Sequence, residues 1–303
     1  MAAYNEAIVS STRVDRPERK TPEPGTVAAL AQRYFTSVRF VSKAQNTKRN
    51  YRRAIESFVE KYGDKRVSSL GLQHIEAILS RMADRPGSAL ELLRGLRVMF
   101  GYGVKIGMIK SNPVAGAEAY KTKPFHTWTD AEVVQFEARW PVGTRQRLAF
   151  ALLLYTAQRS IDVFRLRWPN DTAGFRLTQR KTGTELIIPV HPELEPILLA
   201  TPRQSDFVIT TDTGEPYSLR GFSRVMLDAI RKAGLPVRCK AHGLRKAAAR
   251  RLAEHDATAH QIAAVTGHRT LAEVEKYTRA VDQPRLAGQA FAKHTSDKPS
   301  KPK

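Results

Sequence analysis

The sequence predicts a mainly α-helical protein, with an N-terminal helical bundle followed by a mixed α+β domain that holds a small antiparallel hairpin. The chain has 303 residues, enough for about two ordinary domains. Apolar side chains recur at helical spacing along most of it, and one pair of β-prone runs encloses a glycine-containing turn. The predicted order is a flexible lead over residues 1–24, the bundle over 25–116, a linker over 117–125, the second domain over 126–293 and a disordered tail over 294–303.

The bundle is predicted from two apolar stripes and a shorter pattern between them. In each stripe apolar residues lie three and four positions apart, which places them on one helix face. The first stripe comprises Tyr51, Ala54, Ile55, Phe58 and Val59, and the second Leu92, Leu93, Leu96, Met99 and Phe100. A short helix between them is indicated by Leu70, Ile75, Ile78 and Leu79. The pattern ends at Gly107 and Asn112-Pro113.

The chain is strongly basic. Its net charge is +21 and its sequence pI about 10.3, which is typical of proteins that bind a polyanion, most often nucleic acid. Residues 25–123 hold eighteen lysines and arginines against seven acidic residues, a net +11. We expect the bundle to contact the DNA backbone through Lys48, Arg49, Arg52, Arg53, Arg94 and Arg97. The alternative is a solvated charged face that serves only solubility.

The second domain is predicted to begin with helices. Thr129 and Glu132 have the spacing of a capping box, which satisfies the first free N–H groups of a helix. Helical patterns follow through Val133, Phe136 and Trp140, and again over residues 148–155. A further helical segment is indicated by Ile161, Phe164 and Trp168.

A hairpin interrupts this helical pattern. The runs 175–180 and 185–190 are β-prone and flank Lys181-Thr182-Gly183-Thr184. Helices are then expected over 219–233, 242–252 and 259–265, the last of them ended by Gly267. A second capping box, Thr270 with Glu273, begins the helix that carries Tyr277.

Cysteine usage and the N-terminus predict a soluble, cytoplasmic protein. Cys239 is the sole cysteine in the sequence, so no disulfide framework or cysteine-based zinc site can form, and we expect it to be a small apolar filler. Residues 1–20 lack the apolar core of a secretory signal. The longest apolar stretch, 148–157, is far short of the ~20 residues that cross a bilayer.

Six side chains form the candidate active site. Two arginines can each offer parallel donors to phosphate oxygens, a lysine adds an ammonium, two histidines add imidazoles and a tyrosine adds a phenol. They are Arg159, Lys181, His242, Arg245, His268 and Tyr277. Asp162, one turn after Arg159, is expected to orient that guanidinium. The set suits metal-free attack of a tyrosine on a phosphodiester, and we expect no metal or other cofactor.

Each of these residues also has an ordinary structural interpretation. His242 and Arg245 share a helix face, as many surface pairs do. Tyr277 lies beside an apolar stripe and could anchor its helix by packing alone. Lys181 is at a predicted turn, where most lysines are simply solvated. The five fragments in this order, rather than any one of them, carry the functional interpretation.

These fragments resemble the tyrosine recombinase family, and within it the phage-type integrases. The resemblance is carried by Thr-Ala-Gln-Arg159-Ser-Ile-Asp-Val, Lys181-Thr-Gly, His242-Gly-Leu-Arg245, Thr-Gly-His268 and Tyr277. It extends upstream, since the bundle is similar to the family's core-binding domain, and it covers about residues 25–293. The expected function is therefore site-specific recombination that integrates or excises a mobile element.

The resemblance implies a role for each residue. Arg159 and Arg245 would clamp the scissile phosphate, and Tyr277 would attack it to give a 3′-phosphotyrosine. Lys181 would protonate the leaving 5′ oxygen, His242 would assist proton transfer, and His268 would hydrogen-bond the phosphate. Family members act as tetramers on two paired duplexes, so the implied partners are double-stranded DNA and three further copies of the chain, with an accessory excision factor as a further candidate.

Two features differ from the family pattern. Ala157 occupies a position where the family usually has glycine, a change that we expect to be tolerated. About 24 residues precede the bundle, which is too few for the arm-binding domain of lambda-type integrases, so a simpler recombinase is expected. Two other functions remain open: a type IB topoisomerase-like enzyme, and a DNA-binding regulator without catalysis on the same scaffold.

Overall fold

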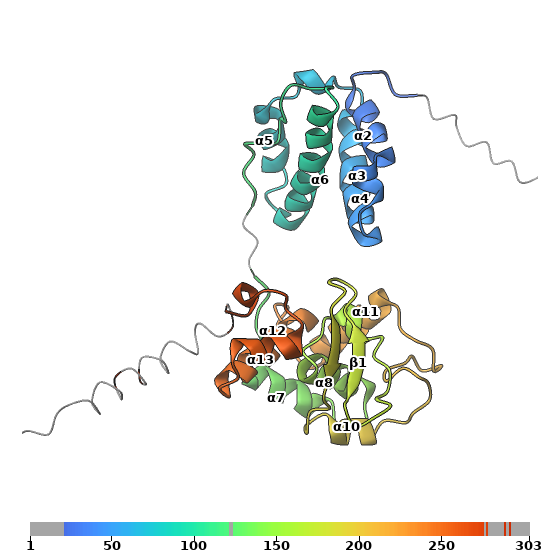
Figure 1. Ribbon diagram of the computed structural model, residues 1–303, viewed down its shortest axis with the longest axis vertical. Helices are drawn as coiled ribbons and strands as arrows, with labels where there is room; N and C mark the ends of the chain where they lie inside the picture. The colour runs from blue at the N-terminus through green and yellow to red at the C-terminus, as the bar shows by residue number, and fades with distance from the viewer. Residues whose placement is uncertain (1–20, 121–123, 276, 278–287, 289–290, 292–303) are drawn as a thin grey trace, which may run out of the picture. The chain divides into compact units, whose positions relative to one another are not determined.

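The computed structural model describes residues 21–120, 124–275, 277, 288 and 291, in two compact units that divide between Lys123 and Pro124 (Figure 1). The boundary falls inside the segment predicted as a linker. Most of the predicted flexible lead, residues 1–20, and the whole predicted tail, 294–303, lie outside the described residues. The predicted fold class is confirmed, because the described elements are mainly helices with one antiparallel pair of strands.

The first unit is built from helices alone in its described part. Their bounds are α2 Val27–Thr36, α3 Val38–Val41, α4 Gln45–Tyr62, the 3-10 turn η1 Val67–Ser69, α5 Leu72–Ser80 and α6 Pro86–Lys105. The two predicted stripes lie on α4 and α6, which pack against each other and against α2. Gly95 of α6 faces α4 at this contact, where a Cβ would meet the Ala54 Cβ at 3.4 Å, an ordinary packing distance. Leu30, Phe58, Leu96 and Phe100 are buried in the core between these helices.

The second unit surrounds one buried helix. Its elements are α7 Asp130–Arg139, α8 Arg145–Tyr155, α9 Ser160–Val163, β1 Phe175–Thr178, β2 Glu185–Ile188, α10 Glu195–Leu199, α11 Leu219–Lys232, α12 Ala241–Glu254 and α13 Ala259–Thr266. Every residue from 148 to 154 is buried, so α8 is apolar on all sides after its first turn and lies in contact with α9, α10, α11 and α12. The predicted capping box at Thr129 and Glu132 is present at the start of α7.

The hairpin forms where it was predicted, and the helical segment before it is shorter than predicted. Phe175 pairs with Ile188 and Thr178 with Glu185 in antiparallel register. The segment predicted from Ile161, Phe164 and Trp168 is wrong beyond its first turn, since α9 ends at Val163. Trp168 instead donates its backbone N–H to the Asp206 carbonyl at 3.1 Å, and it precedes a proline, which disfavours helical backbone.

Among the described helices, none is both long enough and apolar enough to cross a membrane.

Candidate active site

Arg245 is the buried centre of the candidate site. It lies one turn into α12 and is 2% exposed. Its Nη1 donates to the Ala157 carbonyl at 2.8 Å, and its Nη2 lies 3.0 Å from His268 Nε2. Burial, and then the charge of Arg159, lowers the pKa of the guanidinium to about 10, so it stays protonated at neutral pH. Among the described residues no carboxylate lies within ion-pair distance of Arg159 or Arg245.

His268 is a neutral imidazole whose tautomer follows from its neighbours. The Thr266 hydroxyl donates its one proton to the Ile262 carbonyl at 2.7 Å, and the same oxygen lies 2.7 Å from His268 Nδ1. Nδ1 therefore carries the ring proton, and Nε2 accepts from Arg245. Burial, and then the Arg245 charge, lowers the pKa of the ring to about 4. In this state His268 has no free N–H for a phosphate.

Tyr277 lies beside these groups. Its ring centroid is 5.9 Å from that of His268, and it packs against a small apolar cluster that includes Ala249, Ile262 and Val274. Burial raises the pKa of its phenol, while the Arg245 and Arg159 charges act in the opposite direction. Part of the preceding helix, residues 271–275, is described and is helical. The packing interpretation and the nucleophile interpretation of this tyrosine are thus compatible.

Arg159 lies at the start of α9, and a residue of the hairpin holds its guanidinium. Its Nη1 donates to Gln179 Oε1 at 3.0 Å, immediately after β1. Asp162 has a different partner from the one expected, because its Oδ1 accepts from the Arg180 backbone N–H at 2.9 Å. Burial raises the pKa of Asp162, and its Oδ2 has no hydrogen-bond partner. Asp162 therefore fixes the end of the hairpin and acts on Arg159 through its charge.

Lys181 and His242 lie at the exposed side of the candidate site. Lys181 is exposed in the turn of the hairpin, as predicted. His242 is exposed on the first turn of α12, with its ring edge-on to Phe125 at 5.0 Å. Local desolvation and the charges of Arg245, Arg159, Lys246 and Lys181 lower the pKa of His242. The ring is therefore neutral at pH 7 and can accept a proton.

The Thr-Ala-Gln-Arg segment turns sharply between α8 and α9. Ala157 has φ +54° and is buried, a left-handed conformation that alanine rarely adopts. This turn aims the Ala157 carbonyl at Arg245 and places Gln158 and Arg159 on the far side of it. The family's usual glycine at this position is explained by the same angle. The alanine is accommodated here at a conformational cost.

Glycines in the two histidine motifs allow close packing. A Cβ at Gly243 would lie 2.3 Å from the His126 carbonyl, where α12 meets the segment that leads to α7. Gly267 has φ +69° and ends α13, and a Cβ there would lie 2.5 Å from Gln179 Nε2. Both glycines are thus required by the approach of other elements to the site.

Three polar residues of the site were not predicted from the sequence. Gln158, Gln179 and Thr266 are fully buried, and hydrogen bonds through Gln179 and Thr266 join Arg159 to His268. The sequence does contain a signal for them. Gln158 directly precedes Arg159, and Gln179 and Thr266 stand two positions before Lys181 and His268. Buried polar side chains need partners, and motif residues are the nearest candidates.

A second cluster of potential ligands lies near the start of α12. Atoms of His126, Glu132 and Cys239 lie within 4.8 Å of one another. His126 Nε2 is 2.7 Å from one oxygen of Glu132, and Arg238 donates to the other at 3.2 Å. The nearby guanidinium opposes a bound cation, and burial raises the pKa of the Cys239 thiol to about 12, so its thiolate is disfavoured. The cluster connects α7 to the loop before α12.

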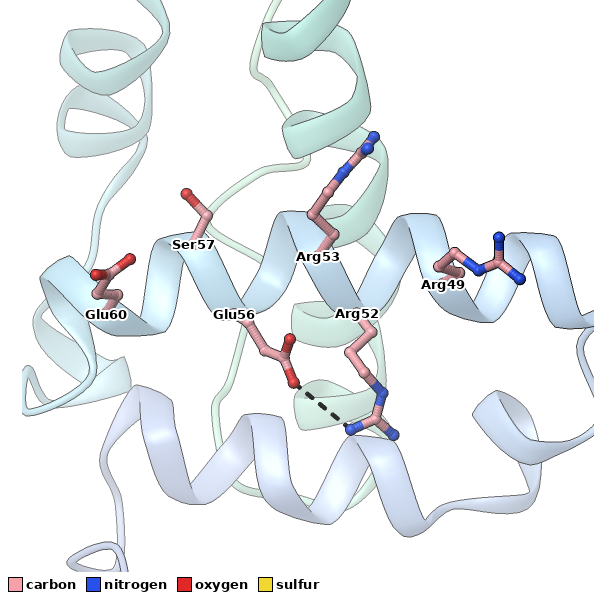
Figure 2. Close-up of a pocket in the computed structure, with 6 residues that line it drawn as sticks. All are labelled: Arg49, Arg52, Arg53, Glu56, Ser57 and Glu60. Atoms are coloured by element: carbon pink, nitrogen blue, oxygen red, sulfur yellow. Dashed lines mark ion pairs between the residues drawn. The ribbon is translucent and has the colours of Figure 1, made fainter. Parts of the chain in front are cut away.

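The six side chains of the first unit that are predicted to contact DNA differ in whether they already have a partner within the protein. Figure 2 shows three arginines along α4, with Arg52 paired to Glu56 at 3.6 Å. Arg52 also lies over the Phe35 ring, and Arg53 pairs with Glu91 at 2.7 Å. Lys48 and Arg97 donate to the backbone carbonyls of Val41 and Ala117. In the described part of the chain Arg49 and Arg94 make no hydrogen bond or ion pair and are exposed.

Comparison with known proteins supports the assignment of the fold and family. The "Integrase" of Escherichia phage HK022 is 26% identical over 225 residues, which cover 69% of this chain and 63% of that relative. The chain thus spans less than two thirds of the relative's length. A lambda integrase dimer bound to a COC′ core site superposes with a TM-score of 0.74 at 23% identity, covering 84% of this chain and 95% of the other.

A second solved structure supports the same fold. The Tn1549 transposon integrase in complex with circular intermediate DNA gives a TM-score of 0.69 at 16% identity, covering 85% of this chain and 99% of the other. The model of the phage integrase family matches residues 131–283, which is half of the chain and contains Arg159, Arg245 and Tyr277. The chain is a member of the phage integrase family.

Proposed function

We propose that this protein is a site-specific DNA recombinase that breaks and rejoins strands through a covalent 3′-phosphotyrosine. The observation that carries the proposal is the pair of guanidiniums, Arg159 and Arg245, which has no carboxylate at ion-pair distance among the described residues. Two unpaired cations in a partly buried site require an anion. A phosphodiester beside Tyr277 supplies that anion where the nucleophile lies.

The chemical step conserves the energy of the broken bond. The Tyr277 phenolic oxygen forms a bond to phosphorus, and the bond from phosphorus to the 5′ oxygen breaks. The phenolic proton passes to a neighbouring base, for which neutral His242 is the candidate. Lys181 protonates the departing 5′ oxygen, and the two arginines stabilise the charge that gathers on the phosphorus oxygens. Reversal of these transfers rejoins a strand.

The proposal extends to partners. A solved structure related in fold is a lambda integrase tetramer bound to a Holliday junction, with a TM-score of 0.71. We propose that this chain likewise acts as a tetramer on paired duplexes, with the bundle gripping DNA through the basic residues of α4 and α6. An accessory factor that directs excision belongs to the same proposal.

A nicked suicide substrate tests the nucleophile. Wild-type protein should form an SDS-stable adduct with the DNA, because the short fragment beyond the nick diffuses away before religation. Tyr277→Phe should form none while binding the same DNA with unchanged affinity, since the ring packing is kept. Gel electrophoresis of labelled DNA measures both.

Arg159→Ala provides the second arm of this experiment. It should slow adduct formation by roughly 10²–10³-fold or more, the scale of losing a charged donor at a phosphoryl-transfer site. Normal cleavage by Tyr277→Phe would refute the proposal. Relaxation of a plasmid that lacks any recombination site would favour the topoisomerase-like function instead.

A further inference from the structure

Gln179 is a fully buried side chain at the end of β1 whose amide uses all of its hydrogen-bonding capacity. Its Oε1 accepts from Arg159 Nη1 at 3.0 Å and from the Thr182 hydroxyl at 2.8 Å. Its Nε2 donates to Gln158 Oε1 at 2.7 Å and to the Thr266 carbonyl at 2.8 Å. An amide offers two acceptor sites and two N–H donors, so none remains free.

The orientation of this amide is fixed by chemistry. A guanidinium can only donate, so the atom facing Arg159 must be the oxygen. A backbone carbonyl can only accept, so the atom facing Thr266 must be the nitrogen. Gln158 is fixed in the same way, because its Nε2 donates to the Thr156 and Val265 carbonyls. The network has a single satisfied arrangement.

Three segments of the candidate site meet at Gln179. The first is the start of α9, through Arg159. The second is the turn that carries Lys181, through the hydroxyl of Thr182. The third is the segment that carries His268, through the Thr266 carbonyl and through Gly267, whose lack of a side chain leaves room for the amide. No other described side chain hydrogen-bonds to all three segments.

Positioning of this kind has a large effect on phosphoryl transfer. Arginine and lysine side chains are long and lose rotamer freedom when they are fixed, and a donor misplaced by ~1 Å can cost about 10²-fold in rate. Gln179 holds one N–H of Arg159 and leaves the other donors of that fork free for phosphate. Through Thr182 it also limits where the Lys181 turn can lie.

We propose that Gln179 is a positioning residue that sets Arg159 and Lys181 relative to the scissile phosphate and the leaving oxygen. The inference rests on the proposed function, because it assigns an effect to residues whose roles are themselves proposed. Loss of Gln179 should therefore weaken two effects: the stabilisation of phosphate charge by Arg159, and the protonation of the leaving oxygen by Lys181.

Chemically altered DNA separates these effects from a loss of folding. Gln179→Met removes all four hydrogen bonds and keeps the length of the side chain. Single-turnover cleavage at saturating protein is compared on three suicide substrates: the natural phosphodiester, an uncharged methylphosphonate at the scissile position, and a substrate whose leaving 5′ oxygen is replaced by sulfur. The methylphosphonate needs less positive charge, and a thiolate leaves without being protonated.

Gln179→Met should cleave the phosphodiester about 10²-fold more slowly than wild type. The deficit should fall below about tenfold on the methylphosphonate and shrink on the sulfur substrate. An equal deficit on all three substrates, or none on the phosphodiester, would overturn the inference. Gln135→Met is the matched control, because Gln135 donates to the Ala233 carbonyl away from the site, and it should cleave at the wild-type rate.

Thr182→Val keeps the test decisive if Gln179→Met does not fold. It removes the bond from the Lys181 turn to Gln179 with little change of shape at a half-buried position. Its deficit should be relieved by the sulfur substrate and not by the methylphosphonate, and the reverse pattern would overturn the inference.

Arg159→Ala and Tyr277→Phe are measured in the same experiment to test the proposed function separately. Adducts formed by Tyr277→Phe, or an Arg159→Ala deficit that the methylphosphonate leaves unchanged, would count against the proposed function instead.

Discussion

His268 shows how neighbours set the protonation of a single side chain. The Thr266 hydroxyl and the Arg245 guanidinium each fix one ring nitrogen, and burial with the Arg245 charge lowers the pKa to about 4. The expected role of hydrogen-bonding the phosphate therefore requires a change in this arrangement when DNA enters. Without DNA, His268 supports Arg245 rather than offering a donor of its own.

Nitrogen NMR of the histidines without DNA tests this state. The His268 ring should show a proton on Nδ1, none on Nε2, and no titration between pH 5 and 8. Because the unfolded value is near 6.5, unfolded chains bind the proton first as pH falls. The contribution to stability is thus full above pH 6.5 and is lost between pH 6.5 and 4. A ring that titrates near 6.5 would contradict the assignment.

Ala157 provides a second test at the scale of one residue. Ala157→Val should destabilise the second unit by about 2–4 kcal/mol, because a β-branched residue is strained at φ +54° and the site is already buried. Ala157→Gly should stay within about 1 kcal/mol of wild type, since relief of the left-handed angle and the greater freedom of the unfolded chain oppose each other. Chemical denaturation measures both, and a neutral valine would contradict the conformational cost.

At the scale of elements, Glu132 joins the start of α7 to the loop that precedes α12, while Asp130 bonds to α12 itself through Arg250 and Arg251. Burial opposes the charge of Glu132, but bonds from the Thr129 N–H, His126 and Arg238 outweigh it and lower its pKa to about 2. The stability it contributes is therefore present above pH 4.5 and is lost as pH falls toward 2. This carboxylate caps one helix and anchors the approach to the other.

Glu132→Gln should destabilise the protein by about 1–3 kcal/mol, because it weakens the bonds to a charged group and leaves Arg238 without its partner. The deficit should shrink steeply as pH falls toward 2, because the wild-type carboxylate then becomes protonated as well. Exposed Glu185 serves as the control, and Glu185→Gln should fall within about 0.5 kcal/mol of wild type. Urea titrations at two pH values give both differences, and equal losses for the two variants would refute the connection.

Local signals predicted most of the elements. The hairpin around Lys181 and the capping box at Thr129 each depend on a few adjacent residues, and both were found where expected. The helix predicted to reach Trp168 was not found, because the Trp168 backbone N–H bonds to the Asp206 carbonyl, which comes from a distant part of the chain. Short α10 was not predicted either, since five residues give too little periodicity to detect.

The sequence predicted the charged and imidazole side chains of the candidate site but not the buried polar residues that connect them. Arg159, His242, Arg245 and His268 stand in recognisable fragments of sequence. Gln179 does not, because its role depends on four partners that come from three separate segments. Pairings of this kind arise only when the hairpin folds against α9 and α13. The place of Gln179 two residues before Lys181 marks it as a neighbour of the site but does not show which residues it bonds.

For the whole molecule, charge predicts how binding responds to salt. Each lysine or arginine that neutralises a phosphate should add about one to the slope of log K against log salt. Arg49 and Arg94, which have no partner among the described residues, are the best candidates for such contacts in the first unit. The net charge of +21 predicts a steep dependence overall.

Arg49→Ala and Arg94→Ala should each lower the slope by about one and weaken binding to all DNA sequences alike. Arg53→Ala is the matched control on α4, because Arg53 already pairs with Glu91 and its slope should change less. Fluorescence anisotropy at several salt concentrations measures the slopes. Unchanged slopes in both Arg49→Ala and Arg94→Ala would show that the faces of α4 and α6 that carry these two residues do not contact DNA phosphates.

The guanidiniums of Arg159 and Arg245, which have no carboxylate at ion-pair distance among the described residues, have a practical consequence for handling the protein. The Arg159 charge lowers the pKa of Arg245, and a small dianion bound beside both guanidiniums would relieve this repulsion. Purified material should therefore melt at a higher temperature in sulfate than in chloride of equal ionic strength, and vanadate or pyrophosphate should compete with oligonucleotides for the candidate site. Buffer choice during purification thus becomes a first, inexpensive probe of the candidate site.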